Sequence, residues 1–280
     1  MQDRSIRASA TNNWADCERR LVAVSFPELV RALGIEFERR PLHIGAHVGT
    51  ASHAGVAAMW REVALSAGDW PAHSIAVEIG EASLIKTFAD DGVVFDDTTK
   101  DRDEAITATA KILAAYRDHR SPAIVPLAFE SLLEARIRPG WKLTGHADLV
   151  STDAVFVADI GLDDLKTGVQ IPSPGPQLGS YDLLLEATGT LLKLVQMTFI
   201  RRTRRTAEQP PPLVVPMDRG IIRRQARYAI NEITTKVDAL AKGADIFTVK
   251  ANTNSRLCGA KYCPAFGTDW CPESRSKIIG

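Results

Sequence analysis

The spacing of apolar and polar positions divides the chain into a helical first part, a middle part rich in strands and a helical last part. Apolar residues recur at intervals of three and four over long stretches, which is typical of helices with one buried face. Glycines or a Ser-Pro step follow several of these stretches and can end a helix there. The helices expected on this basis cover residues 11–34 (with a second short helix starting at Pro27), 50–67, 102–119, 177–187 and 218–242.

Three shorter stretches in the middle of the chain predict strands. They are residues 142–150, 154–166 and 191–202, the first two rich in Val, Leu and Phe. Gly161 is expected to mark a bend or bulge in the second of them. The order of helices, strands, helix, strand and helix predicts a mixed α/β core with a helical N-terminal elaboration.

Composition is that of an ordinary globular protein. The chain has 280 residues, of which 45% are hydrophobic and 24% charged, so one elaborated domain with an adequate core is expected. The net charge of zero excludes a uniformly basic coat protein but not an enzyme that acts on nucleic acid. The N-terminus has no apolar run of the signal-peptide kind, and the most apolar stretch, residues 191–200, is too short to span a bilayer. We therefore expect a cytoplasmic protein with no membrane partner.

Acidic and basic side chains stand at matching places on the first two expected strands. Asp148 lies near the end of one strand, and Asp164 and Lys166 lie at the end of the next. Alternate residues of a strand share a face, so Asp164 and Lys166 point the same way and Asp163 points the opposite way. If the strands are neighbours, Asp148 joins that pair. Two carboxylates that hold Mg²⁺ or Mn²⁺, beside a lysine that faces the phosphate, suit phosphodiester hydrolysis. The alternative is a set of solvated charges at strand ends.

Four short motifs follow one another along the chain: GTASH at 49–53, GHAD at 145–148, DLKTG at 164–168 and QLGSY at 177–181. In order and spacing they resemble the motifs of the RecB-like branch of the PD-(D/E)XK nucleases, which includes AddB-type and CRISPR-associated exonucleases. The resemblance runs through most of the chain. It implies an α/β fold with a PD-(D/E)XK restriction-endonuclease-like core, in which helices flank a central mixed sheet. It also implies a helical N-terminal elaboration and a cysteine-rich C-terminal tail that holds a metal cluster.

The resemblance implies a single nuclease domain over residues 1–280. Within it we expect a helical N-terminal part at 1–120, a catalytic core at 121–205, and a C-terminal helix with the cluster-binding tail at 206–280.

The same resemblance implies roles for the site residues. Asp148, Asp164 and Lys166 are the expected catalytic residues, and His53 joins the two aspartates as a metal ligand. Gln177 and Tyr181, which share a helix face, are expected to bind substrate beside the site. The alternatives are a hydrogen-bonded core histidine and a glutamine and tyrosine that only pack.

A further acid is expected ahead of the strand that carries Asp148. Glu130 and Glu134 both precede that strand. We favour Glu134 as the additional acid, because it lies closer in sequence to Asp148.

Four cysteines predict a second metal site. Cys17 lies in the N-terminal part, and Cys258, Cys263 and Cys271 lie within fourteen residues of the tail. Disulfides are disfavoured in a reducing cytoplasm, so clustered cysteines indicate metal. The resemblance implies a 4Fe-4S cluster, with tetrahedral zinc as the lesser alternative and four buried thiols as a third. The gaps of four and seven residues are longer than is usual in tails of this kind.

Two arginine-rich segments are candidates for contact with a phosphate backbone, although a solvated charged face is the alternative. The arginines are Arg201, Arg202, Arg204 and Arg205 after the last expected strand, and Arg219, Arg223, Arg224 and Arg227 on the next helix. No base-reading motif is present in the sequence. Sequence-independent cutting is therefore favoured over site-specific cleavage.

Together these features predict a Mg²⁺- or Mn²⁺-dependent deoxyribonuclease. We expect an exonuclease that hydrolyses phosphodiester bonds at single-stranded DNA ends in recombination, repair or phage DNA processing. The sequence has no helicase signature, so a helicase or recombination partner would supply any unwinding. The alternative is a non-catalytic module that binds DNA or a partner and is stapled by an iron–sulphur cluster or zinc.

Overall fold

The computed structural model describes residues 3–37, 41–65, 73–153 and 159–277. The N-terminal part contributes most of the helices. Its elements are β1 (Arg4–Arg7), α1 (Ala8–Asp16), α2 (Glu18–Ser25), α3 (Pro27–Arg31), β2 (Leu42–His43), α4 (Ile44–Leu65), α5 (His73–Asp91), β3 (Val93–Val94) and α6 (Arg102–His119).

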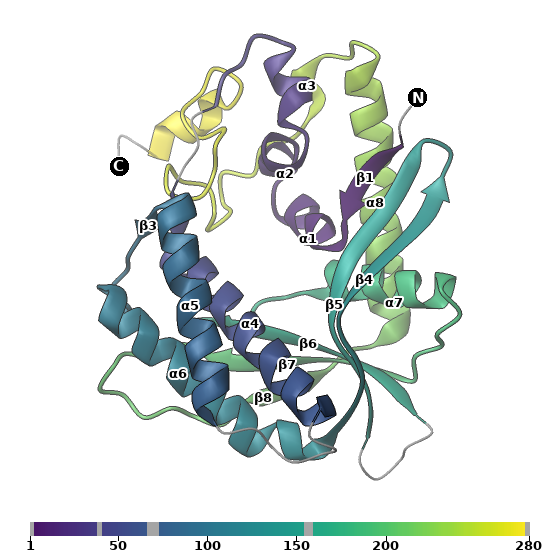
Figure 1. The fold of residues 1–280 in the computed structure, drawn as a ribbon. Helices are drawn as coiled ribbons and strands as arrows, with labels where there is room; N and C mark the ends of the chain where they lie inside the picture. The colour runs from purple at the N-terminus through teal and green to yellow at the C-terminus, as the bar shows by residue number, and fades with distance from the viewer. Residues whose placement is uncertain (1–2, 38–40, 66–72, 154–158, 278–280) are drawn as a thin grey trace.

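The remainder of the chain supplies most of the strands and two long helices. These elements are β4 (Ile124–Arg138), β5 (Trp141–Asp153), β6 (Ile160–Gly168), α7 (Gly175–Ala187), β7 (Leu194–Arg201), β8 (Leu213–Pro216) and α8 (Arg219–Ala241). The cysteine-bearing tail follows α8 with only short 3-10 turns, which Figure 1 shows in yellow beside α2 and α3.

The central sheet is mixed and runs in the order β1-β5-β6-β7-β8, with β4 paired to β5. β5 runs parallel to β1 and antiparallel to β4 and β6. β6 and β7 are parallel, and β8 closes the far edge antiparallel to β7. The expected central mixed sheet flanked by helices is therefore confirmed.

Helices cover both faces of this sheet (Figure 1), and each layer has its own hydrophobic core. One core joins α1, α2, α7, α8 and the tail to residues such as Leu143 and Leu162. The other joins α4, α5 and α6 to Leu149 and Leu165. Burial of both sheet faces fits the apolar residues Ile160, Leu162 and Leu165 of β6, since such strands lack a solvated side.

The structure adds elements that were not predicted, namely β1, β2, α5, β3, β4 and β8. A helix begins at Pro27 as expected, but the stretch ahead of it is divided into two short helices by extended backbone at Cys17. β4 is rich in Leu, Glu, Ala and Arg, which have good helix propensity, so its pairing with β5 overrides local preference. The expected strand residues 154–158 and helix residues 66–67 lie outside the described residues.

In the described ranges, no helix combines the length and the apolar character that crossing a membrane requires.

Candidate metal and catalytic centre

The candidate site lies at a gap along one edge of β5. β4 pairs with β5 along its whole length, but two different strands share the other edge. β1 pairs with β5 as far as Thr144, and β6 pairs with it only from Leu149 onward. Between these pairings, residues 145–148 have no strand neighbour on that edge within the described part of the chain. The carboxylate of Asp148 therefore stands where β1 and β6 diverge.

Three side chains from three elements meet at this gap. His53 of α4, Glu130 of β4 and Asp148 of β5 each place a ligand atom within 4.8 Å of the others. His53 Nδ1 lies 3.3 Å from Asp148 Oδ1 and 3.8 Å from Glu130 Oε1. A second oxygen of Asp148 accepts a hydrogen bond of 2.8 Å from the backbone N–H of Leu165, which ties β5 to β6. An imidazole and two carboxylates form a donor set that suits a divalent metal.

Glu130 has an unusual backbone conformation. Its φ is +46°, the only positive φ found among the described non-glycine residues. This conformation costs roughly 1 kcal/mol or more for a residue with a Cβ. The surrounding strand pairing must hold it, because Phe129 and Ser131 keep their partners on β5. The strained residue is also the one that supplies a carboxylate to the cluster.

Asp164 and Lys166 complete the centre from β6. Lys166 Nζ lies 2.7 Å from Asp164 Oδ2, so both side chains are on the same side of the strand. Asp163 faces the other way, where Arg120 donates to it at 2.6 and 2.9 Å and Thr198 at 2.7 Å. The two adjacent aspartates therefore lie on opposite faces of β6: Asp163 forms a buried ion pair with Arg120, and Asp164 faces the candidate site.

The protonation of these groups follows from their close packing. Burial lowers the pKa of His53, but the charge of Asp148 and the hydrogen bonds that His53 donates to Asp148 and Glu130 outweigh it and raise that pKa to about 10. Burial raises the pKa of Asp164 to about 7 against the opposing charge of Lys166. The pKa of Lys166 lies above its usual value, because Asp164 and Asp148 together outweigh its burial. Without metal, His53 is therefore protonated at neutral pH, and Asp164 is protonated in part.

Asp164 supplies a test of whether a metal fits here. Its side chain is 1% exposed, and its Oδ1 atom has no hydrogen-bond partner among the described residues. A buried carboxylate oxygen without a donor is costly unless something electropositive meets it. The orphaned oxygen, together with the donor set of His53, Glu130 and Asp148, fits a divalent cation.

Gln177 and Tyr181 of α7 lie on the other side of the gap. Gln177 Nε2 donates to the Tyr181 hydroxyl at 3.3 Å. Burial and the charges of Asp164 and Asp148 raise the pKa of Tyr181 to about 12, so its hydroxyl stays neutral. The Tyr181 ring packs closely against β5 at Gly145, since a Cβ there would lie 2.6 Å from it. Gly145 in the GHAD motif is explained by this close approach.

Helix α7 is held in place by a residue of α1. The residue before α7 is Pro174, whose side chain makes no cap. Asn12 Oδ1 instead accepts the backbone N–H of Gln177 at 3.1 Å, one of the N-terminal amides that a helix leaves unpaired. The N-terminal helix therefore positions the residues beside the centre, a role with no signal in the sequence pattern.

The structure does not bring Glu134, the favoured additional acid, to the centre. Glu134 pairs with Thr144 of β5, four residues before Asp148, and its half-exposed carboxylate accepts a hydrogen bond from Lys142 at 2.6 Å. Glu130 takes its place beside Asp148. Closeness in sequence misled because the strands form an antiparallel hairpin, in which residues later in β4 pair with residues earlier in β5.

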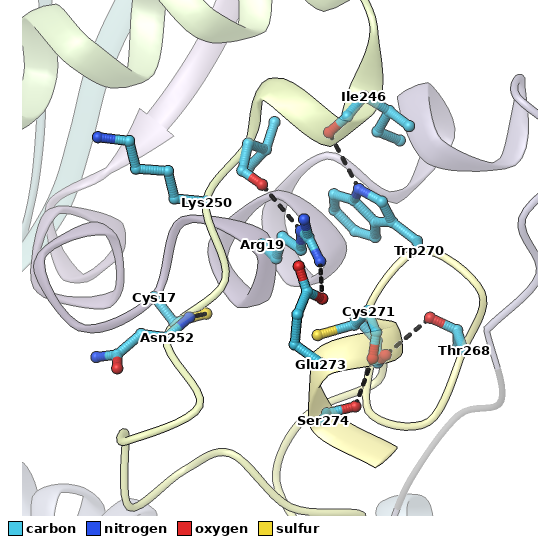
Figure 2. Close-up of polar contacts among 12 residues, drawn as sticks. Cys17, Arg19, Ile246, Lys250, Asn252, Thr268, Trp270, Cys271, Glu273 and Ser274 are labelled. Carbon is cyan, nitrogen blue, oxygen red and sulfur yellow. Dashed lines mark hydrogen bonds and ion pairs between the residues drawn. The ribbon is translucent and has the colours of Figure 1, made fainter. Parts of the chain in front are cut away.

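All four cysteines line one small cavity between the N-terminal helices and the tail. Cys17 lies at the extended junction of α1 and α2, and Cys263 and Cys271 are buried with it, while Cys258 is half-buried. Burial raises the pKa of the Cys263 thiol to about 11, with a further contribution from the neighbouring Cys17 and Cys271. Figure 2 shows Cys17 and Cys271 approaching from the two ends of the chain.

Hydrogen bonds hold the tail against α2 (Figure 2). Arg19 donates to the Val249 carbonyl at 2.9 Å and to Glu273 at 2.6 Å. The backbone N–H of Asn252 donates to Cys17 Sγ at 3.4 Å. Trp270 is fully buried and donates to the Ile246 carbonyl at 3.1 Å. The cysteine cavity is therefore part of a docked structure rather than of a loose tail.

Three of the candidate phosphate-contacting arginines are paired with acidic side chains. Arg202 is buried and pairs with Asp96 at 2.6 Å. Arg219 pairs with Asp182 at 2.9 Å, and Arg223 lies 3.6 Å from the same carboxylate. Acidic partners neutralise these three charges, so they do not form a continuous phosphate-tracking face.

No protein-family model matches the sequence, and no curated protein matches it either. Among solved structures, a Eubacterium rectale protein described as "Putative exonuclease" is similar at a TM-score of 0.43 and 12% identity, over 85% of this chain and 80% of that one. The protein SSO0001 is similar at a TM-score of 0.26 and 16% identity, over 73% of this chain and 82% of that one. Superpositions this loose support no argument about fold or activity.

Proposed function

We propose that this protein is a divalent-metal-dependent phosphodiesterase that hydrolyses DNA, and that it belongs to the RecB-like PD-(D/E)XK nucleases. The observation that carries the proposal is the convergence of His53, Glu130, Asp148, Asp164 and Lys166 at one gap in the sheet. Five polar groups from four elements, several of them buried, are costly to assemble unless they serve a site.

The chain's own residues divide the work of hydrolysis. His53, Glu130, Asp148 and Asp164 would hold Mg²⁺ or Mn²⁺, which polarises a bound phosphate and activates water. Lys166 stays protonated beside Asp164 and stabilises the negative charge that develops on the phosphate oxygens. Gln177 and Tyr181 present neutral hydrogen-bonding groups next to this charge and orient the strand.

Single-stranded DNA ends are the proposed substrate, in recombination, repair or phage DNA processing, with a helicase as a possible source of unwound strands. Support comes from the absence of a base-reading motif in the sequence. A protein without one cuts wherever a strand can reach the metal centre, and an exonuclease needs no more than that.

The test is digestion of end-labelled single-stranded and double-stranded DNA with Mg²⁺ or Mn²⁺. Lys166→Ala is expected to lower the cleavage rate by about 100-fold or more, the usual effect of removing one transition-state charge partner. Lys86→Ala, on the exposed side of α5, is the matched control and should cleave at the wild-type rate. Full activity of Lys166→Ala would remove the assigned centre.

For the second site, we propose that the four cysteines hold a 4Fe-4S cluster that staples the N-terminal helices to the tail. All four cysteines line one cavity among the described residues. A 4Fe-4S cluster uses four thiolates, one on each iron, and the resemblance favours it over zinc.

A non-catalytic DNA- or partner-binding module is the second candidate function. The observation that favours it is the docked cysteine tail, which stabilises the fold without any need for catalysis. Retained DNA binding without cleavage under Mg²⁺, Mn²⁺, Ca²⁺ or Zn²⁺ would establish it.

Anaerobic purification distinguishes an iron–sulphur cluster from zinc at the cysteine site, because only a cluster gives a brown protein that contains iron and sulphide.

A further inference from the structure

One face of the β4–β5 hairpin leads away from the metal centre. Thr144, His146 and Asp148 alternate along β5 and therefore share a face. Arg7 of β1 is paired with Thr144, so its side chain leaves the sheet on this same face. The neighbouring positions Ile6 and Leu143 are 1% exposed and belong to the opposite, buried face. At about 3.3 Å per residue, Thr144 lies about 13 Å along the strand from Asp148.

A polar groove opens where this face meets α1 and the end of α2. Its volume is about 560 Å³, within the range of sites that hold ligands. Hydroxyl and amide side chains make up most of its lining. The lining residues are Ser5, Arg7, Ser9, Ala10, Asn13, Val24, Ser25 and Thr144.

Arg7 gives the groove its charge. Its side chain is exposed, and the described residues offer its guanidinium no ion pair or hydrogen bond. The nearby acids have partners of their own: Asp3 lies 2.8 Å from Arg136, and Glu134 lies 2.6 Å from Lys142. The groove therefore combines one uncompensated positive charge with hydroxyl groups, and no free carboxylate lines it. This chemistry recognises a phosphate.

We infer that this groove binds the phosphodiester backbone of the substrate strand, at phosphates removed from the one that is cleaved. The inference rests on the proposed function, because it takes Asp148 to mark the cleavage point. A strand that crosses His146 passes from the metal centre to Arg7 along one continuous sheet face. The contact is to the backbone alone, so it adds affinity without sequence preference. It also supplies the positive charge that Arg202, Arg219 and Arg223 do not.

The test measures binding separately from cleavage. A fluorescently labelled 20-residue oligothymidylate is titrated with protein in EDTA, and anisotropy gives Kd at several salt concentrations. Arg7→Ala is expected to raise Kd by about tenfold, as for a lost hydrogen bond to a charged group. It should also reduce the slope of log Kd against log salt by about 0.7, the value for one phosphate on a single strand. Arg7→Lys should recover part of the affinity.

Two further variants test the role of the groove, one inside it and one far from it. Ser9→Glu places a negative charge in the groove and should raise Kd by at least as much, while a glutamate in the first turn of α1 remains favourable for the helix. Arg102→Ala, an exposed arginine at the start of α6, is the matched control and should bind like the wild type. Thermal unfolding of each variant checks that the fold is retained.

Hydrolysis of bis(p-nitrophenyl) phosphate with Mn²⁺ separates failure of this inference from failure of the proposed function. This small diester reaches the metal centre but cannot span to the groove. Wild-type affinity and salt slope in both Arg7→Ala and Ser9→Glu would overturn the groove assignment, even if both substrates are cleaved. Loss of oligonucleotide binding in those variants would support it, even if the wild type cleaves neither substrate.

Discussion

At the scale of single residues, strand register decides which acid joins the centre. Glu130 and Glu134 lie four residues apart on β4 with similar sequence surroundings, yet only Glu130 lies opposite the gap at Asp148. The left-handed backbone at Glu130 accompanies that position. Strain of this kind persists where the surrounding structure holds it and a site makes use of it.

The first prediction compares these two glutamates. Glu130→Gln is expected to weaken Mn²⁺ binding by about tenfold or more, because it removes one charged ligand. Glu134→Gln should leave the affinity unchanged, since that carboxylate only pairs with Lys142. Isothermal titration calorimetry measures both affinities. Equal losses in the two variants, or a loss in Glu134→Gln alone, would contradict the placement.

The second prediction concerns pH. His53 binds a metal only as a neutral imidazole, and its pKa of about 10 means that a proton must leave first at neutral pH. Asp164, with a pKa of about 7, adds a second proton below pH 7. Metal affinity should therefore rise with pH, by about tenfold per unit for each proton displaced. The slope should approach two below pH 7 and one above it.

The measurement is Mn²⁺ affinity at pH 6, 7 and 8, with proton release followed in buffers of different ionisation enthalpy. His53→Asn should lower the slope by one unit at each pH. A metal affinity that does not change with pH in the wild type would show that these protons are absent.

At the scale of elements, the contact of α7 with α8 fixes the helix that carries Gln177 and Tyr181. Gly179 lies between these two residues, and a Cβ built there would overlap the Ile222 carbonyl of α8. The two helix backbones touch at this point, so the glycine in the QLGSY motif is required by packing. Asn12 of α1 then secures the beginning of the same helix.

The third prediction follows from that contact. Gly179→Ala is expected to destabilise the protein by about 2–3 kcal/mol, because backbone atoms cannot yield to the added methyl group as a side chain could. Gly161→Ala, where a Cβ would meet its neighbours at 3.6 Å or more, is the control and should change stability by less than about 0.5 kcal/mol. Urea unfolding measures both. Equal stability of the two variants would show that α7 and α8 move apart at no cost.

At the scale of the whole molecule, the cysteine cavity joins the two ends of the chain. Cys17 follows α1, and α1 carries Asn12, so the tail, the N-terminal helix and the α7 residues beside the centre form one connected structure. A metal bound to the four thiols would contribute its binding energy to the folding of both ends.

The fourth prediction tests this staple. Cys17→Ser is expected to lose the bound metal and to lower the melting temperature by about 10 °C or more, given the size of structural metal contributions. Lys261→Ala changes the same tail but keeps all four thiols, and should retain the metal. Metal analysis measures the metal content of both variants, and thermal unfolding measures their melting temperatures. An unchanged metal content in Cys17→Ser would exclude that residue as a ligand.

The sequence by itself determined the elements with strong local patterns: α6 was predicted with its observed bounds, and α7, α8, β5 and β7 to within three residues, while the start predicted for α4 was six residues late. The sequence also placed Asp164 and Asp163 on opposite faces of β6, because successive side chains of a strand point to opposite sides whatever the rest of the fold is. It could not determine β4, whose residues favour a helix, nor the choice of Glu130. Both depend on pairing with β5, and pairing register is a contact between segments rather than a property of either one. The hydrogen bond by which Asn12 caps α7 likewise exists only after distant segments meet. The same is true of the ion pairs formed by Arg202, Arg219 and Arg223.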